Sequence, residues 1–254
     1  MPGLPLDASA HGYEIDRLIL LLHLLMLVLF VGWGIFFTVA VFRFRQSRHP
    51  QADYNGLKSH VPEAVEWAVA VVEILLLAAF SIPFWVRQVN AFPNRKDTLE
   101  VHVVAEQFAW NIHYPGKDGI FGRTDITLLD KQSNPLGLDS RDPHAQDDFT
   151  TINQLYLPIG RPVVIYLTSK DVMHSFSLPV MRVKQDVIPG MSIPTWFIPT
   201  KTGKFEIACA QLCGLGHYRM RGFLVIQKLE DYEKWVEEQA SQSSSSGAEE
   251  DFWN

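Results

Sequence analysis

The sequence contains little cysteine and has no excess of positive charge. Its two cysteines are too few for a disulfide scaffold, an all-cysteine zinc site or a four-thiolate iron–sulfur cluster. The motif CxxCH is missing, so no covalently attached c-type haem is expected in this chain. The net charge of −6 argues against nucleic-acid binding through phosphate contacts. With 47% hydrophobic and 20% charged residues, the chain does not resemble a disordered protein.

Two long apolar stretches lie in the N-terminal part of the chain, residues 1–97. They cover about residues 18–42, where His23 is the only ionisable group, and about residues 67–86, which include Glu73. Each has the length of roughly 20 residues that a helix needs to cross a bilayer. The first stretch has neither a basic n-region nor a small-residue cleavage site, so we expect a retained helix and not a signal peptide. The pattern predicts a two-helix transmembrane hairpin.

The loop between the two stretches carries most of the nearby positive charge. It holds Arg43, Arg45, Arg48 and Lys58, against a single acidic residue before Glu63. Positively charged loops stay on the cytoplasmic side. We therefore expect a two-pass protein of the bacterial inner membrane, with both termini and the domain after the helices on the periplasmic side.

The chain after the helices has the pattern of an all-β domain. Residues 98–230 contain several short runs rich in β-branched and aromatic residues, separated by Pro, Gly or Asn, which is typical of a sandwich or barrel. Residues 116–150 are rich in Gly, Asp, Asn and Pro and predict a long loop or loosely paired hairpins. Residues 231–254 predict a short helix followed by a disordered acidic tail.

One segment concentrates the side chains that bind soft metals. In CAQLCGLGHYRM, Cys209, Cys213, His217 and Met220 are spaced by four, four and three residues, and His174 lies upstream in DVMHSFSLP. Thiolates, imidazoles and a thioether suit copper better than calcium or magnesium. Because two thiolates can each bridge two metals, the set could hold two copper ions, with one histidine on each. A plain disulfide and a zinc site with the two histidines are the alternatives.

The motifs DVMHSFSLP, VKQDVIPGM and CAQLCGLGHYRM resemble those of subunit II of haem–copper cytochrome c oxidases. The resemblance covers nearly the whole chain and implies a cupredoxin-like fold for the β domain. It also implies a dinuclear copper A centre. The thiolates of Cys209 and Cys213 would bridge the two coppers, and His174 and His217 would bind one copper each. The Met220 thioether would bind one copper and the Gln211 backbone carbonyl the other.

The same resemblance implies a function and partners. Copper A would accept single electrons from a c-type cytochrome and pass them to haem a of subunit I, which reduces O2 to water with proton pumping. Subunit III would be a further partner. Quinol-oxidising relatives have lost the copper ligands, whereas this chain has all of them, so we expect a protein donor. Since no haem c is expected in this chain, that donor would be a separate and tightly bound cytochrome subunit.

Two positions depart from the family pattern, and a third, Asp171, follows it. The family usually has Glu at the position of Gln211, and this Glu binds magnesium at the subunit I interface; an amide is a weaker ligand for a hard cation, which weakens the case for magnesium here. Where many relatives have QWYW, this chain has Phe108 and Ala109 before Trp110, so Phe108 and Trp110 are the candidates for the point where electrons enter. Asp171 matches acidic residues that dock the donor.

Further candidate residues concern protons and the subunit I interface. Relatives have a Glu near the start of the second helix, at the mouth of a proton channel, and the register does not choose between Glu63, Glu66 and Glu73. For Glu73, pairing within a helix contact is the alternative. Lys184 and Asp186 resemble residues at the subunit I interface, and the alternative is that they are surface charges.

Two other functions stay open. The copper A subunit of a membrane nitric oxide reductase can have the same features, and the metal beside the haem in the catalytic subunit distinguishes the two. A non-catalytic periplasmic copper-binding or assembly protein is the second alternative, although it would need fast metal exchange. The two helices and the lack of a propeller domain argue against nitrous oxide reductase.

Overall fold

The computed structural model describes residues 3–51, 54–55, 59–130 and 133–250, with side chains as far as residue 241. The chain forms two compact units. One consists of residues 14–92, and the other combines residues 3–13 with the chain from residue 93 onward.

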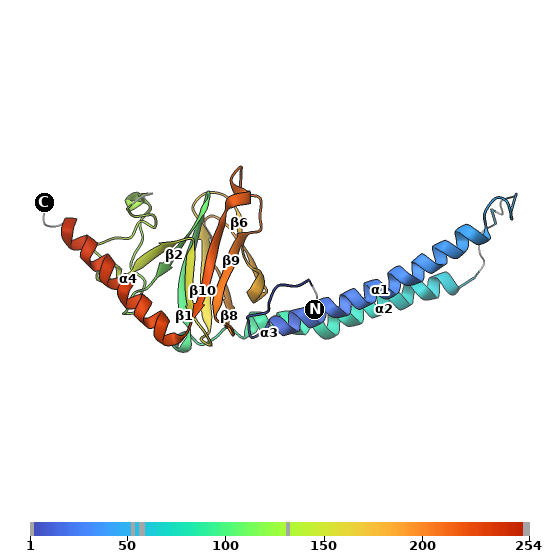
Figure 1. The fold of residues 1–254 in the computed structure, drawn as a ribbon, viewed down its shortest axis with the longest axis horizontal. Helices are drawn as coiled ribbons and strands as arrows, with labels where there is room; N and C mark the ends of the chain where they lie inside the picture. Colours follow the sequence, from blue (N-terminus) through green and yellow to red (C-terminus); the bar gives the residue numbers. More distant parts are fainter. Residues whose placement is uncertain (1–2, 52–53, 56–58, 131–132, 251–254) are drawn as a thin grey trace. The chain divides into compact units, whose positions relative to one another are not determined.

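The first unit is a helical hairpin. It consists of α1 (Gly12–Arg43) and a second helical stretch made of α2 (Val61–Leu76), the π-helical turn η1 (Leu77–Ser81) and α3 (Ile82–Asn90). Figure 1 shows α1 and α2 side by side. Pro83 has no N–H to donate to the preceding turn, which accounts for the irregular turn before α3. Both stretches are long and apolar enough to cross a membrane, and they contain the two predicted spans.

The side chains of the hairpin face outward along most of its length. The most apolar window of each helix has no buried residues, so its surface needs lipid or partner helices around it. At one end the guanidinium of Arg87 donates to the carboxylate of Glu14 over 2.6 Å, and Arg17 lies 5.6 Å from the centre of the Phe80 ring. These contacts join the start of α1 to the far end of the second stretch.

The second unit is a β-sandwich of two five-stranded sheets. The strand orders are β3-β2-β1-β5-β8 and β4-β10-β9-β6-β7, with parallel pairing of β1 with β5 and of β4 with β10. The strands are β1 (Leu99–Glu106), β2 (Ala109–Tyr114), β3 (Phe149–Ile152), β4 (Gln154–Pro158), β5 (Val163–Ser169), β6 (His174–Leu178), β7 (Val183–Val187), β8 (Ile193–Phe197), β9 (Gly203–Cys209) and β10 (Arg221–Gln227).

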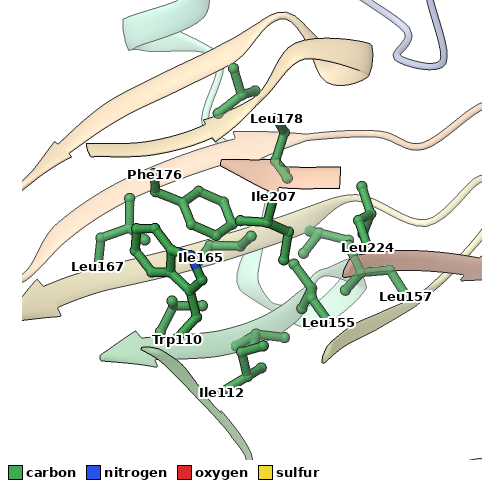
Figure 2. Close-up of a cluster of buried hydrophobic side chains, with 14 of the residues drawn as sticks. Trp110, Ile112, Leu155, Leu157, Ile165, Leu167, Phe176, Leu178, Ile207 and Leu224 are labelled. Atoms are coloured by element: carbon green, nitrogen blue, oxygen red, sulfur yellow. The ribbon is translucent and has the colours of Figure 1, made fainter. Parts of the chain in front are cut away.

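The core of the sandwich lies between the two sheets. Buried and less buried residues alternate along β10, as expected for a strand with one face on the core. Figure 2 shows Trp110 and Ile112 from one sheet close to Phe176 and Ile207 from the other, and all four are fully buried. This packed frame fixes the ends of β6 and β9, where two of the predicted copper ligands lie.

The segment before the first helix packs onto the β-sandwich, which the sequence did not predict. Ala8 is fully buried, donates its backbone N–H to the Val180 carbonyl and accepts from Thr200 N–H, both over 2.8 Å. The guanidinium of Arg182 donates to the Pro5 carbonyl over 2.8 Å. Residues 3–13, here called the N-terminal strap, therefore belong to the same unit as the chain that follows the second helix.

A substitution at Ala8 tests whether the N-terminal strap packs on the β-sandwich. Replacing Ala8 by Asn is expected to lower the stability of the β unit by about 1–3 kcal/mol, because the amide would be buried without a partner. Each kcal/mol lost should lower the unfolding temperature by about 2–4 °C. Near-ultraviolet circular dichroism of the full chain in detergent measures this temperature. Leu6, whose side chain is 53% exposed, provides the control variant Leu6→Asn, expected within about 0.5 kcal/mol of wild type. Equal unfolding temperatures for both variants would contradict the packing.

The described residues between β2 and β3, 116–130 and 133–148, form a long connection with short helical turns. They contain the short 3₁₀ helices η3 (Ile126–Leu128) and η4 (Pro143–Ala145). Nε2 of His113 on β2 lies 2.7 Å from Oδ2 of Asp148, and both side chains are buried. The same carboxylate accepts from Gly122 N–H over 2.8 Å. This buried pair holds the connection against the sheet.

The C-terminal helix is longer than predicted. α4 spans Leu229–Glu250, so the expectation of a short helix followed by a disordered tail does not hold as far as residue 250; residues 251–254 lie outside the described part. The Trp235 ring stacks on Tyr156 at 4.3 Å and also contacts Tyr114 and Phe149. This packing fixes the first turns. Extending a formed helix is easier than nucleating one, so the serine-rich stretch continues it.

Candidate metal centre

The predicted copper ligands come from three places in one sheet. His174 is the first residue of β6 and is fully buried, and Cys209 is the last residue of β9. Cys213 lies in the loop that joins β9 to β10, and His217 begins the short helix η6 (His217–Arg219) in the same loop. The antiparallel pairing of β9 with β6 and with β10 brings both ends of this loop next to the start of β6.

The donor atoms form a compact cluster. The two sulfurs of Cys209 and Cys213 are 3.8 Å apart. The Nδ1 atom of His174 lies 3.9 Å from the first sulfur, and Nδ1 of His217 lies 3.6 Å from the second. The Met220 sulfur is 3.8 Å from the Cys213 sulfur, and the Gln211 carbonyl oxygen is 3.2 Å from the Cys209 sulfur. The structure thus brings together all six predicted ligands.

This arrangement fits a dinuclear copper centre. Each sulfur has an imidazole nitrogen of its own, and the thioether and the carbonyl lie on opposite thiols. Both cysteines are free thiols. Soft sulfur and borderline imidazole donors of this kind select copper over hard cations.

Comparison with known proteins identifies the family. Residues 99–228 match the family model described as cytochrome c oxidase subunit II, periplasmic domain. The alternative cytochrome c oxidase subunit 2 of Bradyrhizobium diazoefficiens is 38% identical over 216 residues, which cover 84% of this chain and 76% of that protein. The chain belongs to the cytochrome c oxidase subunit II family. The resemblance predicted from the three motifs is confirmed.

Two further similar proteins have lower sequence identity. Cytochrome c oxidase subunit 2 of Synechocystis is 28% identical over 251 residues, covering 92% of this chain and 74% of that protein. A solved structure of the periplasmic domain of subunit II from Bradyrhizobium japonicum is 28% identical, with a TM-score of 0.44; the match covers 59% of this chain and 98% of that domain. As a subunit II, the chain is part of a haem–copper terminal oxidase and of respiratory electron transport, with two membrane-spanning helices and a cupredoxin-like domain.

The electrostatics of this subunit II site make the two thiols unequal. Burial raises the pKa of Cys209, but hydrogen bonds with the His174 ring and with the backbone of Ser175 and Gln211 outweigh it and lower the pKa to about 6. Burial is the main cause that raises the pKa of Cys213 to about 11, and the charge of the nearby Cys209 acts in the same direction. Since copper binds thiolates, metal uptake must displace the Cys213 proton.

Asp171 supports the site from behind His174. Its Oδ1 lies 2.9 Å from Nε2 of His174, which leaves Nδ1 facing the Cys209 sulfur. Its Oδ2 accepts from the backbone N–H of Gln107 over 2.7 Å. We predicted a donor-docking role for Asp171; the structure turns both carboxylate oxygens toward the protein, and its side chain is 30% exposed.

These contacts predict the effect of removing the Asp171 carboxylate. Asp171→Ala is expected to weaken copper binding by about 10–100-fold, because partners that orient a ligating histidine have effects of this size. Competition with a copper chelator measures the affinity. Asp186→Ala, which removes an exposed carboxylate from β7, is the control and should bind copper as wild type does. An unchanged affinity in Asp171→Ala would show that the carboxylate does not orient His174.

The two candidates for the point where electrons enter lie in different surroundings. Trp110 is fully buried, with its ring centre 6.1 Å from that of His174 and 5.3 Å from that of Phe176. Phe108 is half-buried at the tip of the β1–β2 hairpin, and the Arg219 guanidinium lies 5.9 Å from the centre of its ring. A docked protein can therefore reach Phe108 at the surface but not Trp110.

The remaining predicted residues lie outside the cluster. Lys184 and Asp186 are exposed on β7. Glu63, Glu66 and Glu73 are exposed on the second helical stretch, and Glu63 lies 3.6 Å from the His60 ring. Within the described residues Glu73 makes no hydrogen bond or ion pair, so a paired contact between the two helices is not observed.

Gln107 contacts the copper loop although no role was predicted for it from the sequence. Its side chain donates through Nε2 to the Cys213 carbonyl over 2.7 Å, across 106 positions of sequence. Glutamine has no pattern that marks such a role, and only the strand pairing places this residue on the copper loop.

Proposed function

We propose that this subunit II accepts single electrons at a dinuclear copper A centre held by His174, Cys209, Cys213, His217, Met220 and the Gln211 carbonyl. The observation that supports this best is the pair of thiols 3.8 Å apart, each with its own imidazole. When bound, such a copper pair takes up and releases one electron at a time.

The residues of this chain prepare the site for that chemistry. Cys213 and Met220 are 4% and 2% exposed and His174 is fully buried, so this side of the cluster is shielded from water. Asp171 orients His174, and the packed sandwich limits movement of the strand ends. A rigid and largely dry site changes little between its two redox states, which keeps the reorganisation energy small.

The donor is a c-type cytochrome that docks at the hairpin tip containing Phe108. The acceptor is haem a of subunit I, where O2 is reduced to water with proton pumping, and subunit III completes the complex. Lys184 and Asp186 are contact residues for subunit I.

Gln211 is exposed, and its amide is a weak ligand for magnesium, so the proposal includes no magnesium ion.

Two independent features support a periplasmic location of the copper domain. The loop between the helices carries Arg43, Arg45 and Arg48, which favours the cytoplasmic side. The N-terminal strap precedes the first helix but folds with the domain after the second. Both outer ends of the hairpin must therefore lie on one side of the membrane, and this is the periplasmic side of the bacterial inner membrane.

Among the three glutamates of the second helical stretch, the proposal assigns proton uptake to Glu73, which lies deepest in the predicted span. An acidic side chain at membrane depth that has no hydrogen-bond or ion-pair partner among the described residues requires a polar neighbour from another subunit or a water-filled path. Glu73→Gln is expected to slow proton uptake and oxidase turnover of the whole complex without changing copper reduction. Flow-flash kinetics of the reconstituted oxidase measure both steps. Glu230→Gln, at an exposed position in the first turn of α4, is the control, and full turnover in Glu73→Gln would exclude the role.

A stopped-flow experiment tests the proposed function. The detergent-solubilised oxidase is mixed with a reduced c-type cytochrome, and the copper absorbance and cytochrome oxidation are followed together. The proposal predicts that both change at the same rate, before haem a is reduced. Copper that stays oxidised while haem a is reduced, or reduction by quinol without a cytochrome, would contradict it.

A further inference from the structure

The tip of the β1–β2 hairpin contacts both segments that hold the copper ligands. The backbone N–H of Gln107 donates to the Asp171 carboxylate over 2.7 Å, and this carboxylate also contacts His174. The side-chain amide of Gln107 donates to the Cys213 carbonyl, also over 2.7 Å. One residue from β1–β2 thus connects the segment before β6 with the loop between β9 and β10.

The copper loop is shaped to receive this tip. Gly214 has a φ of +133°, and a Cβ atom there would lie 2.7 Å from Nε2 of Gln107. A Cβ atom at Gly216 would overlap the Phe108 ring. Gly214 is favoured by its positive φ, and Gly216 is favoured because the Phe108 ring occupies the space that a side chain would fill. The guanidinium of Arg219, from the same loop, also lies over the Phe108 ring.

Two features distinguish this contact from an ordinary surface hydrogen bond. Gln107 itself is exposed, but the residue whose carbonyl it holds, Cys213, is 4% exposed and carries a thiol of the cluster. The loop after Cys209 has no regular structure apart from the three-residue helix η6, and the backbone hydrogen bonds that fix it lie at Ala210 and from Gly214 onward, on either side of Cys213. A bond to its central carbonyl therefore restrains the direction in which the Cys213 side chain points.

We propose that Gln107 is a positioning residue for the copper centre, acting through the Cys213 carbonyl. The inference rests on the proposed copper function and extends it to a residue that contacts no copper ligand atom. Residues that orient metal ligands from outside typically change metal affinity by 10–100-fold when replaced. Because Gln107 is exposed and water competes for its bond, the expected effect is at the lower end, about tenfold.

Two variants test the proposal in the full chain. Gln107→Glu has the same shape but presents a carboxylate, which cannot donate to the Cys213 carbonyl, and Gln107→Leu removes the bond without adding charge. Gln154→Leu, at an exposed position on β4, is the matched control. The reduced, copper-loaded chain is mixed with a Cu(I) chelator, and the rate of copper release is measured. The unfolding midpoint of the copper-free chain and the reduction potential are measured in parallel.

Both Gln107 variants are expected to release copper about tenfold faster than wild type and the control. Their copper-free unfolding midpoints should match the control, and their reduction potentials should shift. Release rates and potentials equal to wild type would overturn the proposal, as would faster release that only follows a lowered unfolding midpoint. If wild type binds no copper pair, the proposed function fails instead, so the two failures are distinguishable.

Discussion

Replacing Cys213 by Ser is expected to abolish the dinuclear centre and to reduce copper affinity by more than about 100-fold, beyond the effect of residues that only orient ligands. The Cys213 sulfur contacts three other donors of the cluster, lying 3.8 Å from the Cys209 sulfur, 3.6 Å from the His217 ring and 3.8 Å from the Met220 sulfur. A hydroxyl cannot replace a bridging thiolate, because it is a harder ligand and stays protonated at neutral pH. Electron transfer from the cytochrome should fall to background.

Copper analysis and steady-state oxidase activity of the purified complex measure this loss. Serine is close to cysteine in size, so the fold should be retained and the effect assigned to the missing thiolate. Ala210→Ser, at an exposed position of the same loop, is the control and should keep two copper ions and full activity. Two copper ions in Cys213→Ser would show that this thiol does not bridge the metals.

Replacing Trp110 by Ala is expected to lower the stability of the β unit by about 3–5 kcal/mol, the usual cost of truncating a large aromatic residue in a core. Trp110 is fully buried and packs against Phe176 on the opposite sheet (Figure 2). Its ring also lies edge-on to the His174 ring. The cavity would open beside a copper ligand, so copper binding should weaken as well. Urea unfolding of the full chain in detergent, followed by tryptophan fluorescence and circular dichroism, measures the loss.

Trp110→Phe separates packing from other roles of the indole. Its Nε1 is buried without a hydrogen-bond partner in the described structure, so its removal breaks no bond. Phenylalanine keeps most of the ring contact, and the loss should stay below about 2 kcal/mol. An alanine variant as stable as the phenylalanine variant would show that this ring does not support the core next to His174.

Short-range patterns were enough to predict the hairpin, the β domain and most of the side chains that cluster as candidate copper ligands. Hydrophobic run length shows a membrane helix directly, and four of the ligand side chains lie within twelve consecutive residues, from Cys209 to Met220. Only His174 lies far from the other ligands in the sequence, and the family motif DVMHSFSLP identified it. These features depend on side-chain type and local spacing, which a sequence displays.

The features that the sequence did not predict depend on long-range backbone contacts. The strap is held mainly by backbone hydrogen bonds around Ala8, and backbone groups are the same in every residue. Gln107 and Cys213 are 106 positions apart, and the buried pair of His113 and Asp148 is 35 apart, so only the fold brings them together. The first turns of α4 pack through Trp235 on Tyr156, a contact that composition alone does not reveal.

The electron paramagnetic resonance spectrum of the copper-loaded full chain tests the central claim most directly. One copper nucleus splits the signal of an unpaired electron into four lines, whereas two equivalent nuclei that share the electron produce seven. The geometry, with two thiols between two imidazoles, predicts the seven-line pattern and two copper ions per chain. A four-line spectrum, or no copper signal because the cysteines form a disulfide or bind zinc, would contradict the dinuclear centre.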